Sequence, residues 1–173
     1  RYLAPDEAQR RMRELERSTR PEAAAIRLLL LSGARKSEIL KARWENVRLD
    51  LRLLTVPLSK SGKPRHLPLS DAAVAVIRAL PRGPGCPWLF PGHAPGKPLS
   101  DVYLFWDGLR RGLGLADVRI HDLRHTFATA SLEHGMDINT LSTIIGHVSS
   151  TTTLNTYTHV TDAMRQNAAD KID

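Results

Sequence analysis

The hydrophobic pattern of this sequence changes from a helical period to alternation in one region and then returns to a helical period. In residues 47–53, apolar and charged residues alternate, which is typical of a β-strand, with a turn near Asp50. Residues 54–58 and 65–69 are two further strand candidates, and the glycine and proline of the connector 59–64 are typical of a hairpin tip. The pattern predicts one small antiparallel sheet.

The rest of the chain carries mostly helical patterns. Residues 24–31 are nearly all apolar, which predicts a buried helix, and Gly33 is suited to end it. Residues 81–98 contain six of the eleven prolines and four of the eleven glycines, so we expect a loop there. Further helices are predicted at about residues 5–18, 36–43, 71–80, 100–113, 121–134, 139–145 and 162–171.

These elements predict a mainly α fold with a small antiparallel β-sheet, in the α+β class. A chain of 173 residues, 42% of them hydrophobic, is long enough for one domain with a real core. Strands do not alternate with helices in the way that a parallel sheet requires, and no glycine-rich phosphate motif is present. Rossmann and P-loop folds are therefore disfavoured.

The charge of the chain is positive and uneven. The net charge is +7 and the pI is about 10.1, which suggests a polyanionic partner. Residues 1–80 carry 17 Lys and Arg against 9 Asp and Glu, so the basic surface belongs mostly to the first half. Four arginines of the first predicted helix also fit a plain solvated helix face, namely Arg10, Arg11, Arg13 and Arg17.

Cysteine content and hydropathy indicate the cellular compartment in which the chain works. Cys86 is the single cysteine, so the chain has no internal disulfide and suits a reducing compartment. The longest apolar run, residues 28–31, is far too short to cross a bilayer. We therefore expect a cytoplasmic location and no membrane partner.

The densest polar cluster opens the helix predicted at residues 121–134. His121, Arg124 and His125 are spaced i, i+3 and i+4, so their side chains share one face. A guanidinium offers a planar fork of donors to phosphate oxygens, and a helix start adds free N–H groups. This cluster favours an anion site.

A zinc site on the same helix is the competing interpretation. His121 and His125 have the spacing of an H-E-x-x-H metallohydrolase helix. However, Asp122 replaces the usual glutamate, and Arg124 would place a fixed positive charge beside the metal. The sequence shows no third zinc ligand at a regular spacing, so a zinc site is disfavoured.

Five motifs follow one another along the chain. They are Gly33-Ala34-Arg35-Lys36-Ser37-Glu38-Ile39, the Lys60 hairpin, His121-Asp122-Leu123-Arg124-His125-Thr126, Ile145-Gly146-His147 and Tyr157-Thr158-His159. The order of these motifs resembles the catalytic domain of the tyrosine recombinases, the phage integrase family. One departure is an extra residue between Gly146-His147 and Tyr157, which is similar to the integrases of conjugative transposons.

The resemblance implies that a tyrosine attacks a DNA phosphodiester, forms a 3′-phosphotyrosine and frees a 5′-hydroxyl, which later attacks in reverse. It implies no metal, nucleotide or other cofactor. The implied roles are nucleophile for Tyr157, phosphate binding for Arg35, Arg124 and His147, acid to the leaving oxygen for Lys60, and acid/base or phosphate ligand for His121.

The resemblance also implies partners. These are double-stranded DNA and, on it, further copies of the chain in a tetrameric synapse, at the bacterial nucleoid. Residues 1–173 would be a catalytic domain, monomeric in isolation, without the N-terminal core-binding domain of family members. The alternative is a DNA-binding module of the same fold that has lost catalysis, although all the implied catalytic positions hold competent residues.

Overall fold

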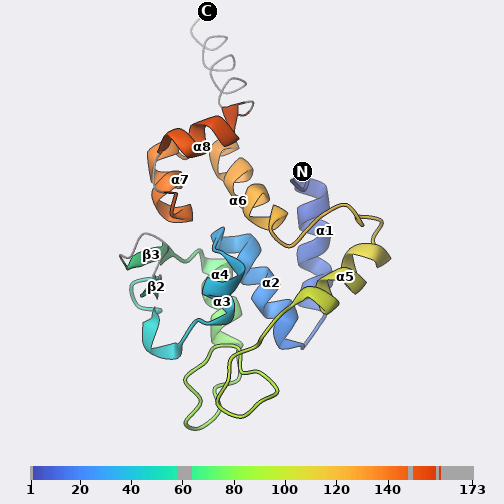
Figure 1. Cartoon of the computed structure of the whole chain (residues 1–173), viewed down its shortest axis with the longest axis vertical. Coiled ribbons are helices and arrows are strands. Elements are labelled where there is room, and N and C mark those ends of the chain that lie inside the picture. The colour runs from blue at the N-terminus through green and yellow to red at the C-terminus, as the bar shows by residue number, and fades with distance from the viewer. Residues whose placement is uncertain (1, 58–63, 148–149, 159, 161–173) are drawn as a thin grey trace, which may run out of the picture.

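A computed structural model describes residues 2–57, 64–147, 150–158 and 160 of the chain (Figure 1). Within them a short 3₁₀ helix, η1 (Trp44–Asn46), precedes three strands, β1 (Val47–Arg48), β2 (Leu53–Val56) and β3 (Arg65–Pro68). The helices are α1 (Pro5–Glu16), α2 (Pro21–Ser32), α3 (Lys36–Leu40), α4 (Asp71–Arg78), α5 (Tyr103–Gly112), α6 (Asp122–Glu133), α7 (Ile138–Ile145) and α8 (Ser150–Thr156).

Helix α2 forms the centre of the hydrophobic core. Apolar residues lie on all sides of it, so it is stable only where other elements cover it completely. It contacts α1, α3, α4, α5 and α6. Pro21 begins the helix at a position where a missing N–H costs nothing, and Gly33 ends it in the left-handed conformation, as predicted.

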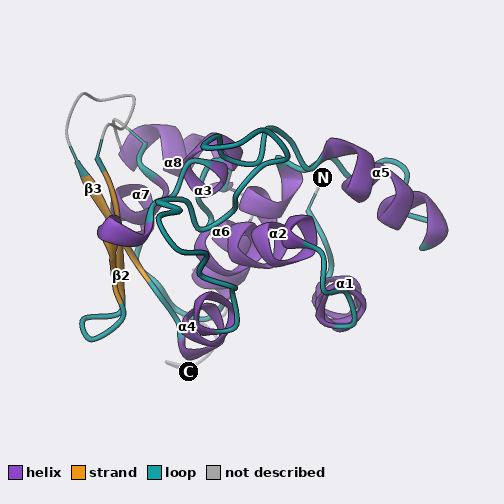
Figure 2. Ribbon diagram, turned by 90° about the horizontal axis from the view of Figure 1, so that it is seen from below, coloured by secondary structure: helices purple, strands orange, loops and turns teal. Residues whose placement is uncertain are grey.

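The sheet lies at one side of the helical body, with α1 and α5 at the other (Figure 2). Its three strands are antiparallel in the order β1-β2-β3, with Leu54 opposite Leu67. Alternate residues face the core, so Leu54 and Leu67 are buried together with Arg65. Helix α7 contacts β3, which brings the C-terminal part of the chain against the sheet.

The predicted fold class is confirmed, with shifts at the element ends. The turn predicted near Asp50 is confirmed, because the chain turns at residues 49–52 and β2 begins at Leu53. Helix α3 ends at Leu40, three residues early, and η1 follows. The helix predicted at 162–171 and the Lys60 hairpin tip lie outside the described residues.

Helix α8 is an element that the sequence pattern did not predict. Its Ser and Thr side chains compete for backbone hydrogen bonds, which gives it a low helix propensity. Its residues also show no amphipathic period. Tertiary packing stabilises it instead. Thr153 is fully buried, and Tyr157 packs directly after the helix in a second apolar cluster with residues of α6 and α7, namely Ala128, Leu132, Leu141 and Ile145.

The interpretation of the four α1 arginines as a solvated face is wrong for Arg11. Its side chain is 1% exposed and lies 5.7 Å from the centre of the Trp106 ring. Its Nη1 donates to the carbonyl of Leu109 at 3.1 Å. Arg11 therefore ties α1 to α5, and its charge is not part of the outer basic surface.

No helix within the described residues combines the length and the apolar character that a bilayer span requires.

The left-handed end of α2 generates a stability prediction. Gly33 has φ +62°, and a Cβ there would lie 2.3 Å from Cδ1 of Phe127. We expect Gly33→Ala to lower the free energy of unfolding by about 2–4 kcal/mol, from backbone strain and overpacking together. Urea titration followed by circular dichroism measures the change.

Gly108 is the matched control, because it lies inside α5 and a Cβ there would meet nothing within 4 Å. Gly108→Ala should raise stability by about 0.5–1 kcal/mol through helix propensity. Equal effects of the two substitutions would contradict the account of Gly33.

Candidate active site

Two guanidinium groups are held at the C-terminal ends of two helices. Arg124 donates through Nη1 to the carbonyl of Gly33, directly after α2, at 2.8 Å. Arg35 donates through Nη2 to the carbonyl of Gly146, directly after α7, at 2.8 Å. Carbonyl groups at helix C-termini lack intrahelical partners and carry partial negative charge, so they attract cations. The two ends bring Arg35 and Arg124 into one site.

Glu38 links Arg35 to the β-sheet. One carboxylate oxygen accepts from Nη1 of Arg35 at 2.9 Å, and the other accepts from the Arg35 backbone N–H at 2.8 Å. The second oxygen also accepts from Arg65, whose other terminal nitrogen donates to the carbonyl of Ile144. Arg65 of β3 therefore links α3 to the end of α7.

The charges in this cluster act on one another. Arg124 is 5% exposed, and its pKa is lowered to about 10, first by burial and then by the charges of Arg35 and Arg65. Glu38 opposes this effect. A pKa of about 10 still leaves the guanidinium protonated at neutral pH, so the site keeps a permanent buried positive charge.

The histidines stand beside these cations. His121, at the start of α6, contacts His125 edge to face, with ring centres 5.3 Å apart. Burial lowers the pKa of His121, and Arg124 lowers it further. The pKa of His147 is lowered by burial and then by Arg124 and Arg35. Imidazoles with pKa values below the usual 6.5 are mostly neutral at pH 7.

Tyr157 follows α8 and is 3% exposed. Its hydroxyl is hydrogen-bonded to Nδ1 of His125 at 2.9 Å, and the two rings are 5.9 Å apart. Burial raises the pKa of Tyr157 to about 12, although the charge of Arg124 acts in the opposite direction. The phenol therefore lies within the electrostatic reach of Arg124.

The structure brings together five of the six predicted site residues. Lys60 lies outside the described residues. The others come from the α2–α3 link, α6, and the turns after α7 and α8, and they are Arg35, His121, Arg124, His147 and Tyr157.

Two supporting side chains were not singled out from the sequence. Arg65 carries a signal that could have found it, because a charged residue occupies an inward-facing position of a strand whose other inward residues are apolar. Thr153 carries no such signal within its run of threonines. Its hydroxyl lies 2.8 Å from Nδ1 of His147.

The zinc interpretation gains no further ligand from the structure. Among the described residues, no group of three or more His, Cys, Asp and Glu side chains is arranged to hold a metal ion. His125 is already hydrogen-bonded to Tyr157, and the buried Asp122 accepts from Arg119. A zinc site at His121 and His125 would need a ligand from outside those residues.

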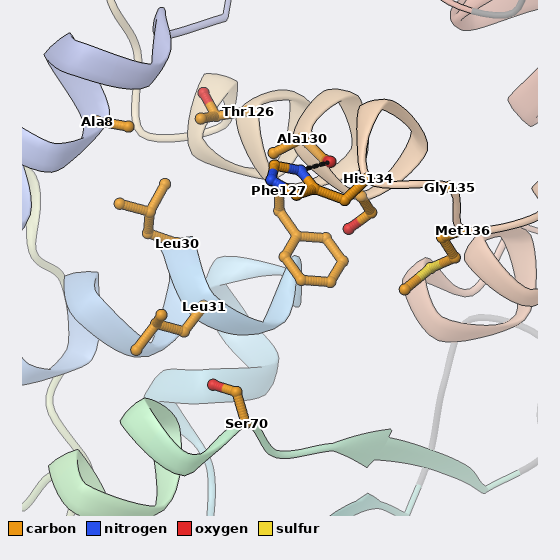
Figure 3. Close-up of a pocket in the computed structure, with 11 residues that line it drawn as sticks. Ala8, Leu30, Leu31, Ser70, Thr126, Phe127, Ala130, His134, Gly135 and Met136 are labelled. Atoms are coloured by element: carbon orange, nitrogen blue, oxygen red, sulfur yellow. Dashed lines mark hydrogen bonds between the residues drawn. The ribbon is translucent and has the colours of Figure 1, made fainter. Parts of the chain in front are cut away.

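An apolar groove of about 900 Å³ lies beside α2 and α6 (Figure 3). Leu30, Leu31, Phe127 and Met136 line it. This lining suits apolar packing and contains no lysine or arginine that could bind a phosphate.

A family model described as the phage integrase family matches residues 1–164. The chain belongs to the phage integrase family. The tyrosine recombinase XerD of Caulobacter vibrioides is 38% identical over 151 residues, which cover 80% of this chain and 49% of that protein. The chain therefore spans about half the length of this curated relative.

Solved structures of integrase-family proteins share the fold. XerA recombinase superposes with a TM-score of 0.78 at 28% identity, covering 98% of this chain and 64% of that one. The Tn1549 transposon integrase, solved with circular intermediate DNA, gives a TM-score of 0.75 over 90% of this chain and 60% of that one. At 20% identity this likeness shows the fold alone.

The buried carboxylate of this phage integrase family member generates a prediction. Burial alone would raise the pKa of Glu38, but hydrogen bonds from Arg35 and the charge of Arg65 outweigh it and lower the pKa. Glu38→Gln should reduce the free energy of unfolding at pH 7 by about 3–5 kcal/mol, because Arg65 loses its buried counter-ion.

Because the pKa of Glu38 is lowered in the folded protein, the contribution of Glu38 to the free energy of unfolding depends on pH. A folded carboxylate of lowered pKa stabilises the protein above the unfolded pKa of about 4.3 and loses that contribution as pH falls through the folded pKa. The stability difference between wild type and Glu38→Gln should therefore shrink below about pH 4.3 in urea titrations. Glu45→Gln, at a 64% exposed side chain paired with Arg43, is the control and should show little effect.

Proposed function

We propose that this chain cleaves one strand of duplex DNA by attack of Tyr157 on a backbone phosphodiester and then joins strands by the reverse reaction. The observation that carries the proposal is the position of the phenol. Its hydroxyl is hydrogen-bonded to His125, whose ring contacts His121, and the buried charge of Arg124 acts on its pKa. Membership of the phage integrase family supports it.

The bond changes balance without a cofactor. The phenolic oxygen of Tyr157 forms a bond to phosphorus, and the bond from phosphorus to the 5′-oxygen breaks. The phenol loses its proton and the 5′-oxygen gains one, so a 3′-phosphotyrosine and a 5′-hydroxyl result. Rejoining runs the same steps backwards, with a 5′-hydroxyl as the attacking group.

The proton of Tyr157 needs an acceptor. A phenol with a pKa of about 12 is almost fully protonated at neutral pH. Burial lowers the pKa of His125, so its imidazole is mostly neutral, and its Nδ1 lies 2.9 Å from the hydroxyl oxygen of Tyr157. His125 therefore holds the phenol in place and is suited to take its proton, while a cation beside the oxygen would favour the phenolate.

The arginines would act on the phosphate. The five-coordinate transition state carries more negative charge than the diester, so fixed donors aimed at its oxygens stabilise it preferentially. We assign this role to Arg35 and Arg124, with His147 as a neutral donor and His121 as an acid/base group or further ligand. Lys60 is proposed as the acid for the 5′-oxygen.

The proposed partner is double-stranded DNA. A net charge of +7, concentrated in the first 80 residues, supports contact with DNA phosphates and an affinity that falls steeply with salt. We also propose that copies of the protein assemble as a tetramer on DNA, in a bacterial cytoplasm at the nucleoid. The assignment of residues 1–173 as a catalytic domain and the likeness to conjugative-transposon integrases stay predictions.

Loss of the proposed nucleophile gives the first functional prediction. The protein, with any flanking sequence that its gene encodes, is incubated with nicked duplexes of randomised sequence. We expect a covalent DNA adduct that survives SDS, and none with Tyr157→Phe. Tyr103→Phe, at a 52% exposed tyrosine of α5, is the matched control and should form the adduct.

If the wild-type protein forms no adduct but still retains DNA on a filter, the chain is a DNA-binding module without catalysis, and the proposal fails.

The second functional prediction concerns the buried arginine. Arg124→Lys keeps a positive charge but loses the planar fork and the bond to Gly33. We expect single-turnover adduct formation to slow by about 10²–10³-fold. Arg111→Lys, at a 68% exposed side chain, should cleave at the wild-type rate. A wild-type rate for Arg124→Lys would remove Arg124 from the proposed phosphate site.

A further inference from the structure

Thr153 lies where the helix before the proposed nucleophile meets His147. Its side chain is fully buried on α8, and its hydroxyl oxygen is 2.8 Å from Nδ1 of His147. Among the described residues, Nδ1 of His147 is the hydrogen-bond partner that the structure gives this hydroxyl. Buried hydroxyl groups pair with hydrogen-bond partners, so this contact decides where the hydroxyl proton points.

The surroundings of His147 favour a neutral ring, whose Nδ1 is able to accept that hydrogen bond. The charges that act on the ring come from Arg124, Arg35 and Arg65, with His125 as the neighbouring titratable group. Burial and these cations lower the pKa of His147, so its ring is mostly neutral at pH 7, and the neutral ring carries one proton. A hydroxyl donor at Nδ1 leaves that proton on Nε2.

The same residue also holds the backbone of the nucleophile. The carbonyl of Thr153 accepts from the backbone N–H of Tyr157 at 3.0 Å, which continues the helical turn beyond α8. One residue therefore contacts His147 through its side chain and Tyr157 through its backbone. A shift of Thr153 would move both groups together.

We propose that Thr153 is a positioning residue whose hydroxyl donates to Nδ1 of His147 and holds the neutral ring in the form that carries its proton on Nε2. The ring then presents an N–H donor to a phosphate oxygen without itself being charged. This role in catalysis rests on the proposed function, whereas the state of the ring does not. Two experiments separate the two claims.

The first experiment reads the ring directly and needs no DNA. The chain is labelled with ¹⁵N-histidine, and its imidazole nitrogens are observed by NMR at about pH 8, where neutral rings dominate. His147→Gln identifies the resonances by their loss. We expect an unprotonated Nδ1 and a protonated Nε2 in wild type. Thr153→Val should give a mixture of both forms, and Thr153→Ser should keep the wild-type form.

A protonated Nδ1 in wild-type His147 would overturn the proposal, because the threonine would then be the acceptor. An unchanged ring in Thr153→Val would overturn it as well. Thermal unfolding confirms that each variant is folded before its spectrum is interpreted.

The second experiment measures single-turnover adduct formation. Thr153→Val removes the hydroxyl but keeps the shape of the side chain, and we expect cleavage to slow about 10–100-fold, as for other residues that orient a functional histidine. Thr153→Ser should restore most of the rate. Thr152→Val is the control, because Thr152 is exposed on the same helix.

Wild-type cleavage by Thr153→Val would contradict a positioning role. If wild type itself forms no adduct, the proposed function fails, and the NMR result still decides the direction of the hydrogen bond.

Discussion

The structure depends on hydrogen bonds between two guanidinium groups and the carbonyl groups at two helix C-termini. Each α-helix ends in carbonyl groups without intrahelical partners, and a buried guanidinium without acceptors is strongly unfavourable. Arg124 at the end of α2 and Arg35 at the end of α7 satisfy both requirements at once. The glycine at each end adopts a left-handed conformation, which turns the chain away and leaves its carbonyl open to the arginine. The same two hydrogen bonds therefore cap the helices and place the cations.

Bringing arginines together opposes folding unless acidic and dipolar groups offset their repulsion. Glu38 contributes to that offset, because it accepts from both Arg35 and Arg65 while nearly excluded from water. Arg65 packs against Gly146, where a Cβ would come within 2.8 Å of its Nε. The sheet thereby supports the turn that carries His147. Chemistry at this site and stability of the fold share the same residues.

The part of the site that carries Tyr157 is built differently. Helix α8 has little intrinsic helix propensity and is held by a small second apolar cluster and the bond from Tyr157 to His125. Burial of the phenol raises its pKa, so this position protects the hydroxyl as well as placing it. The proposed nucleophile is thus held in place by tertiary packing.

Much of this molecule is determined by local pattern. The apolar run of α2, the glycine that ends it, the alternating strands and the spacing of His121, Arg124 and His125 all act over a few residues, so the sequence by itself predicted the fold class and the α6 face. The resemblance of the ordered motifs to the family implied site roles for Arg35, His147 and Tyr157, and these roles stay predictions. Tertiary structure alone decided the burial of Arg11, the formation of α8, and the contacts of Arg65 and Thr153. Arg11 and Arg65 depend on partners far away in the chain. The partner of Thr153 is near in sequence, but the burial of Thr153 comes from packing of α8 on the rest of the fold. Desolvation and packing of this kind leave no periodic trace in the residues themselves.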